Sequence, residues 1–131
     1  MLLRFPASEL SHYRGGHMKL GEKGEGLAVK FLKKKGYMIL EQNFKTNIGE
    51  IDIIALDGNV LVFIEVKTRE SIGFGLPFEA VDRRKRRKIA DVALSYLKRF
   101  DDLPPCRFDV VSIYYENGRA ECELIEDAFE A

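Results

Sequence analysis

Two carboxylates and a lysine lie inside segments that are otherwise apolar enough to be buried β-strands. Asp52 lies in the stretch of residues 50–56, and Glu65 and Lys67 lie in the stretch of residues 63–69. Removing an ionised carboxylate from water without a partner is strongly destabilising, so buried acids are normally paired, bound to a metal ion or shifted in pKa. We therefore expect these side chains to have a chemical role.

The turn between the two stretches determines how their charged side chains face one another. Side chains alternate along a strand, so Glu50 and Asp52 share a face, as do Glu65 and Lys67 on the next strand. A tight turn at residues 57–59 predicts that Asp52 lies opposite Glu65 and that Glu50 lies opposite Lys67. Two adjacent carboxylates repel unless a cation binds between them, and their oxygens favour Mg²⁺ or Mn²⁺.

A partly exposed edge hairpin is the alternative, in which the same charges form cross-strand ion pairs worth up to about 1 kcal/mol. Apolar side chains on both faces argue against it, because they are typical of a strand covered by helices. These residues are Ile51, Ile53, Ile54, Val62, Phe63, Ile64 and Val66.

The chain has 131 residues, of which 46% are hydrophobic and 32% charged, as expected for a single globular domain. We expect residues 1–18 to be a flexible leader and residues 19–131 to form the domain. No apolar run reaches the roughly 18 residues of a membrane span, so we expect no membrane partner and a cytoplasmic location. Cys106 and Cys122 lack metal-ligand spacing, and we expect buried, reduced thiols with no disulfide and no zinc.

Hydrophobic periodicity and turn signals predict an α/β fold with the order αβββαββ and no internal repeat. The predicted helices cover residues 20–35 and 79–100, and the predicted strands cover residues 37–44, 48–57, 60–69, 107–116 and 120–126. Gly21 and Gly24 lie on or beside the apolar stripe of the first helix, where a close approach to the sheet would explain them. Residues 70–79 are expected to form a loop beside the site.

Residues 83–88 are six consecutive basic residues at the start of the second predicted helix. A solvated helix face is the simpler interpretation of such a run. Lys85 and Lys88, however, fall in the same sector of the helical wheel as Ile89 and the other apolar residues, so at least one should point toward the sheet. We expect Lys85 and Arg69 to contact phosphates of a nucleic acid, with basic neighbours contacting its backbone farther out. These neighbours are Arg84, Arg87 and Lys88.

An aspartate followed on the next strand by Glu-Val-Lys, after a helix that carries Gly-Glu, resembles the PD-(D/E)XK nuclease superfamily and its restriction-endonuclease-like fold. The chain more closely resembles the YraN family of bacterial predicted nucleases, which is related to archaeal Holliday-junction resolvases. The resemblance covers about residues 19–126. The motifs that carry it are Gly24-Glu25, Gly49-Glu50-Ile51-Asp52, residues 63–69, Val81 with Lys85, and Arg107-Phe108-Asp109. Ile51 stands where the superfamily name has proline, a position at which proline is often missing.

The resemblance implies a mixed central sheet flanked by helices and a Mg²⁺- or Mn²⁺-dependent endonuclease. Asp52 and Glu65 would bind the metal with the main-chain carbonyl of Val66, and Lys67 would orient or deprotonate the attacking water, or clamp a phosphate. Glu25 would be an additional ligand, although it could equally be a boundary glutamate paired with a basic side chain. Glu50 ranks below Glu25 as a ligand.

The expected substrate is branched or single-stranded nucleic acid, DNA in preference to RNA, and related resolvases make a homodimer an expectation. One alternative is a non-catalytic nucleic-acid-binding protein that retains the nuclease fold. Another is an interaction protein whose acidic cleft binds only metal.

Overall fold

In the computed structural model, which describes residues 2–5, 20–69 and 83–129, the strands form one mixed sheet. The sheet has six strands in the order β1-β6-β5-β4-β3-β2, and β4 and β5 are parallel whereas the other neighbours are antiparallel. The elements are β1 (Leu2–Phe5), α2 (Leu20–Lys34), β2 (Met38–Lys45), β3 (Glu50–Asp57), β4 (Val60–Arg69), α3 (Arg83–Leu97), β5 (Cys106–Glu116) and β6 (Arg119–Ile125).

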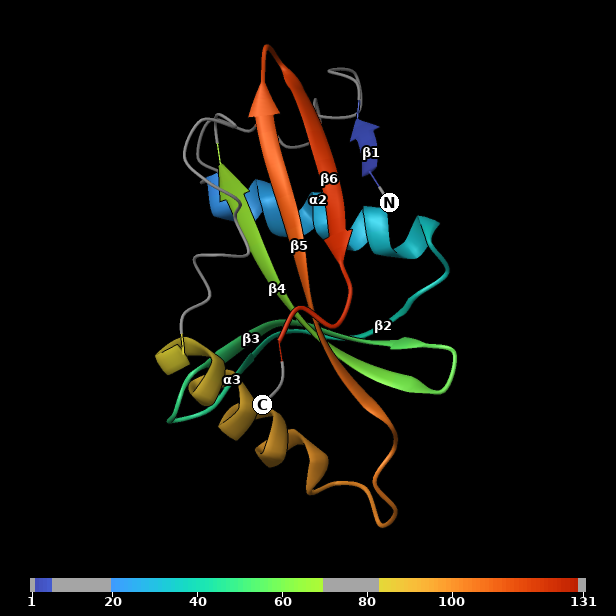
Figure 1. Ribbon diagram of the computed structural model, residues 1–131, viewed down its shortest axis with the longest axis vertical. Helices are drawn as coiled ribbons and strands as arrows, with labels where there is room; N and C mark the ends of the chain where they lie inside the picture. Colours follow the sequence, from blue (N-terminus) through green and yellow to red (C-terminus); the bar gives the residue numbers. More distant parts are fainter. Residues whose placement is uncertain (1, 6–19, 70–82, 130–131) are drawn as a thin grey trace.

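The two helices cover opposite faces of the twisted sheet (Figure 1). Leu27 and Phe31, four residues apart on α2, are buried against one face of the sheet. Ile89 and Val92 of α3 are buried against the other face. Because side chains at these spacings share one side of a helix, the apolar stripe of each helix is what attaches it to the sheet.

The α/β class, the mixed sheet and the order αβββαββ from residue 20 onward are confirmed. The expected loop of residues 70–79 and the first predicted turn of the second helix, residues 79–82, lie outside the described residues. Neither described helix is long and apolar enough to cross a membrane. Both cysteines are free, and the expectation of two buried thiols is wrong for Cys106, which is exposed, whereas Cys122 is buried.

The expectation of a flexible leader over residues 1–18 is wrong at Leu2–Phe5, which form β1 and pair antiparallel with β6. Four residues are too few to show a period of two convincingly, and their pairing depends on an edge that β6 supplies from the other end of the chain. Residues 6–19 lie outside the described part of the chain.

A buried ionic network supports the sheet where β5 begins. The guanidinium of Arg107 donates to both carboxylate oxygens of Asp109, at 2.9 and 3.0 Å, and to Asp57 Oδ2 at 3.1 Å. It also donates to the hydroxyl oxygen of Tyr37 at 2.6 Å. Asp109 is fully buried, so its charge is compensated within the protein and its role is structural.

Gly24 brings α2 close to β4, as its position in the apolar stripe predicts. A Cβ atom at this position would overlap the Cγ2 methyl group of Thr68 and would lie 3.7 Å from Ile113 Cδ1. The glycine therefore sets the distance between helix and sheet, and with it the position of the next residue, Glu25.

We expect Gly24→Ala to lower the free energy of unfolding by about 1–2 kcal/mol, because overpacking outweighs the roughly 1 kcal/mol that alanine gains in helix propensity. Thr68→Ser removes the overlapping methyl group, so Gly24→Ala should cost less in that background. Urea unfolding of both single variants and of the double variant measures the coupling. An alanine that stabilises the protein would contradict the close approach.

Candidate functional site

Strands β3 and β4 separate at Asp52, and the site lies in the fork between them. Their antiparallel pairing runs from Asp57 opposite Val60 to Ile53 opposite Ile64, which is the predicted register. Beyond this point Asp52 Oδ2 accepts a hydrogen bond of 2.8 Å from the backbone N–H of Val66. The carboxylate of Asp52 therefore accepts a backbone hydrogen bond of β4. The two strands diverge beyond their last paired residues (Figure 1).

The expectation that Glu50 pairs with Lys67 is wrong. Glu50 lies opposite Lys45 of β2, whose Nζ is 3.9 Å from Glu50 Oε2. Lys67 Nζ instead lies 3.4 Å from Glu65 Oε1 on its own strand. The divergence of β3 from β4 after Ile53 is the reason, because the pairing ends before Glu50 is reached.

The alternation of side chains along β3 is interrupted at Asp52. Ile53 packs in the core beneath α2, whereas Ile51, two residues away, packs in the core beneath α3. On β2, Gln42 lies opposite Ile53 and Phe44 lies opposite Ile51, so Asn43 lies opposite Asp52. The strand register therefore places an irregular segment beside the candidate site.

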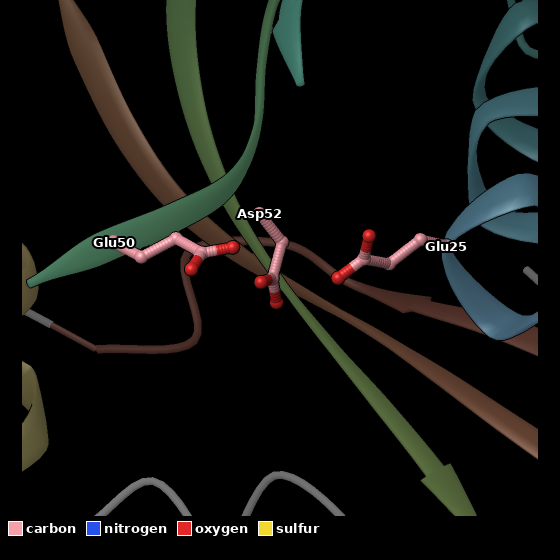
Figure 2. Close-up of side chains that lie close together, drawn as sticks. All are labelled: Glu25, Glu50 and Asp52. Atoms are coloured by element: carbon pink, nitrogen blue, oxygen red, sulfur yellow. The ribbon is translucent and has the colours of Figure 1, made fainter. Parts of the chain in front are cut away.

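Three carboxylates converge at this irregular segment. Glu25 reaches it from α2, and Glu50 and Asp52 reach it from β3 (Figure 2). Each offers an oxygen atom that lies within 4.8 Å of an oxygen of the other two. The structure thus brings Glu25 and Glu50, the two less favoured ligand candidates, next to Asp52.

Glu65 lies in the same site but outside this group of three carboxylates. Its side chain is buried, and its Oε1 lies 2.5 Å from Lys85 Nζ and 3.4 Å from Lys67 Nζ. Asp52 and Glu65 both line a cavity of about 280 Å³, together with Glu50. The charges of Glu65, Asp52 and Glu50 therefore face one space. Lys67 and Lys85 lie close to Glu65, and Lys45 lies 3.9 Å from Glu50.

Crowding of negative charge changes the proton affinity of Asp52. Burial and the neighbouring charge of Glu65 raise its pKa to about 7, and Glu25 and Glu50 add to the rise. The hydrogen bond from Val66 works in the opposite direction. The N–H of Val66 thus contacts the site through Asp52, and the role of its carbonyl as a metal ligand stays a prediction.

The two lysines at Glu65 are shifted in opposite directions. Burial and the adjacent Lys85 lower the pKa of Lys67. Burial also acts to lower the pKa of Lys85, but its hydrogen bonds, chiefly with Glu65, dominate and raise it. Lys85 is therefore the member of the pair that holds its proton more tightly, and Lys67 is the better proton acceptor.

Four basic residues of α3 were expected to contact phosphates, and one of them, Lys88, is both exposed and beside the cavity. Lys85 and Lys88 line the cavity, as their sector of the helical wheel predicts. Arg84 and Arg87 are exposed to solvent. Arg69 is the last residue of β4, lies opposite Tyr114 of β5 and is partly buried.

Asn43 belongs to the site although nothing in our sequence analysis gave it a role. Its backbone φ is 54°, a left-handed conformation that asparagine adopts more readily than other residues with a side chain. Asparagine is uncommon in strands, so its presence in a predicted strand was the available signal.

The comparison with known sequences identifies the family. Residues 24–113 match the family described as Uncharacterised protein family UPF0102. The chain belongs to the UPF0102 family. The resemblance to YraN proteins, which are the same family, is confirmed.

Relatives within UPF0102 are similar over most of the chain. A UPF0102 protein of Symbiobacterium thermophilum is 49% identical over 115 residues, covering 86% of this chain and 98% of the relative. A UPF0102 protein of Caldanaerobacter subterraneus subsp. tengcongensis is 46% identical, covering 86% of this chain and 93% of the relative. One of Chlorobaculum parvum is 53% identical, covering 72% and 74%. The site and both of its helices thus lie within the part shared by the family.

The raised pKa of Asp52 predicts how stability depends on pH. Between the unfolded value of 3.8 and the folded value of about 7, the folded protein holds a proton that the unfolded chain releases. The stabilisation from this proton is complete below pH 3.8 and is lost as the pH rises through 7, with a slope of at most about 1.4 kcal/mol per pH unit.

Asp52→Asn should remove this dependence, because an amide oxygen can still accept from Val66 but carries no charge. In urea unfolding with EDTA, we expect the variant to be more stable than the wild type at pH 8 and close to it at pH 4. A difference in stability that does not change with pH would contradict a raised pKa at Asp52.

Proposed function

We propose that this UPF0102 protein is a Mg²⁺- or Mn²⁺-dependent nuclease that hydrolyses phosphodiester bonds of branched or single-stranded DNA. The observation that carries the proposal is the convergence of Glu25, Glu50 and Asp52 beside a cavity that Glu50, Asp52, Glu65 and Lys85 line, with Lys67 3.4 Å from Glu65. Acids that crowd together beside a lysine of lowered pKa suit metal-assisted hydrolysis of a phosphate ester.

The donor set fits a hard divalent cation. Three carboxylates supply only oxygen atoms, and their mutual distances of up to 4.8 Å allow them to surround one ion. Burial and the charges of Glu65, Glu25 and Glu50 raise the pKa of Asp52, and a divalent ion beside it would favour its ionised form. Glu25, Glu50 and Asp52 would hold the ion, and when bound it would supply Lewis acidity to the phosphate.

Lys67 and Lys85 have separate tasks in this proposal. Lys67, whose pKa is lowered, accepts a proton from the water that attacks phosphorus, while the bond from phosphorus to the leaving oxygen breaks. Lys85 keeps its proton and, through its ion pair with Glu65, fixes that carboxylate beside Lys67. Glu65 thereby positions the amine of Lys67. In this proposal Lys85 stays paired with Glu65 and does not need to contact a phosphate.

The exposed arginines of α3 supply the attraction for the polyanion. Arg84 and Lys88 are four residues apart on one side of the helix, and like charges at this spacing destabilise a helix by roughly 0.2–0.5 kcal/mol. A basic face that is unfavourable for the isolated helix is explained if it neutralises phosphates in the complex.

Cleavage assays test the nuclease directly. With Mg²⁺ or Mn²⁺, labelled branched, single-stranded and duplex DNA and their RNA counterparts should be incubated with wild type, Asp52→Asn and Lys67→Met. We expect cleavage of branched or single-stranded DNA, its loss in Asp52→Asn, and a decrease of about 100-fold or more in Lys67→Met. Lys98→Met removes an exposed lysine just after α3 and should leave cleavage unchanged.

Binding that persists in the wild type without cleavage sensitive to these substitutions would show that the nuclease proposal is wrong. That result would favour a non-catalytic nucleic-acid-binding protein instead.

The dependence of DNA affinity on salt tests the basic face of α3. Arg84→Gln should reduce the slope of log affinity against log salt concentration by about 1, because one phosphate contact is lost. Arg119→Gln removes the same charge from the β5–β6 turn, away from α3, and should leave the slope unchanged (Figure 1). Equal slopes for wild type and Arg84→Gln would exclude this phosphate contact.

A further inference from the structure

Asn43 is held in a conformation that strands rarely contain. Asn117 and Asp127 are the other non-glycine residues with positive φ in the described part of the chain, and both lie in turns outside the strands. Asn43, with φ 54°, lies within β2 and opposite Asp52. A left-handed residue inside a strand is unfavourable by itself, so a compensating interaction of its side chain is expected.

The side chain of Asn43 connects two of the three clustered carboxylates. Its amide nitrogen donates to Glu25 Oε2 at 3.1 Å and to Glu50 Oε1 at 2.8 Å. The orientation of the amide is assigned from these partners, because an oxygen in the same place would face only other acceptors. One NH₂ group thus joins an acid of α2 to an acid of β3.

The chemistry of this connection suits a cation site. Carboxylates that are brought together repel, and a fixed arrangement needs donors that hold them. A lysine or arginine between them would hold them too, but its charge would compete with a bound cation. The amide of Asn43 and the N–H of Val66 carry no net charge, so they restrain the three acids without placing a positive charge between them.

We propose that Asn43 is a positioning residue of the divalent-cation site, which holds Glu25 and Glu50 at the distance that one ion requires. This inference rests on the proposed function, since it assigns a role at the same site. Restraining partners of metal ligands contribute about 10–100-fold to metal affinity, which sets the size of the expected effect.

Asn43→Gly tests the role, because glycine accepts the left-handed backbone and removes the side chain that carries the amide. Binding of Mn²⁺ to the full chain should be measured by titration calorimetry at pH 8, above the pKa of about 7 of Asp52, and thermal unfolding should be measured in EDTA. We expect Mn²⁺ affinity to fall about 10–100-fold, with little change in the unfolding temperature of the metal-free protein.

Gln42→Gly is the matched control, since it removes an exposed amide side chain from the preceding residue of the same strand. We expect its Mn²⁺ affinity to stay within about twofold of wild type even where glycine lowers stability. In a Glu25→Gln/Glu50→Gln background, Asn43→Gly should cause no further loss of affinity, because the acids it positions are absent.

Wild-type affinity in Asn43→Gly would overturn the positioning role and leave the proposed function intact. The positioning role would also be overturned if Gln42→Gly lowered Mn²⁺ affinity as well and if, in both variants, the loss of affinity followed the loss of stability. A wild-type protein that does not bind Mn²⁺ would contradict the metal-dependent function and this inference together.

Discussion

Repulsion among carboxylates that are forced into one space is the constraint on which the rest of the site depends. The fork between β3 and β4 frees the N–H of Val66 for Asp52, and the irregular β2 places Asn43 against Glu25 and Glu50. These neutral donors hold the acids without cancelling their charge. Burial, together with the charges of Glu65, Glu25 and Glu50, raises the pKa of Asp52 to about 7. Close packing of carboxylates lowers folding stability, so we would not expect it in a site whose only role is structural.

The site separates two kinds of negative charge. Glu65 lies between Lys67 and Lys85, whereas Glu25, Glu50 and Asp52 are restrained by the neutral donors of Asn43 and Val66, with Lys45 3.9 Å from Glu50. The resemblance to PD-(D/E)XK nucleases implied a metal between Asp52 and Glu65. Our proposal places the metal at Glu25, Glu50 and Asp52 and gives Glu65 the role of orienting Lys67.

Periodicity and turn signals predicted much of the fold, because they reflect local physics. The apolar stripe of α2, the turn at Gly58 and the register of β3 against β4 follow from spacing along the chain. The expected cost of a glycine inside α2 correctly pointed to a close approach to the sheet at Gly24.

Features that depend on tertiary placement were not predictable in this way. The pairing of Glu65 with Lys85 requires the position of α3 over the sheet, and the end of the β3–β4 pairing at Ile53 depends on the twist of the sheet. The sequence shows an asparagine at position 43, but asparagine adopts both ordinary and left-handed conformations. Its left-handed backbone is therefore known only from the structure. The strand β1 is too short to be recognised without its partner β6.

The most direct test of the account is anomalous diffraction from crystals of the wild-type protein grown with Mn²⁺ at pH 8. The account predicts an anomalous peak among Glu25, Glu50 and Asp52, with Mn²⁺ bound to a carboxylate oxygen of each and with Lys85 still paired with Glu65. A peak bound by Glu65 but by neither Glu25 nor Glu50, or no peak at these acids in crystals saturated with Mn²⁺, would contradict it.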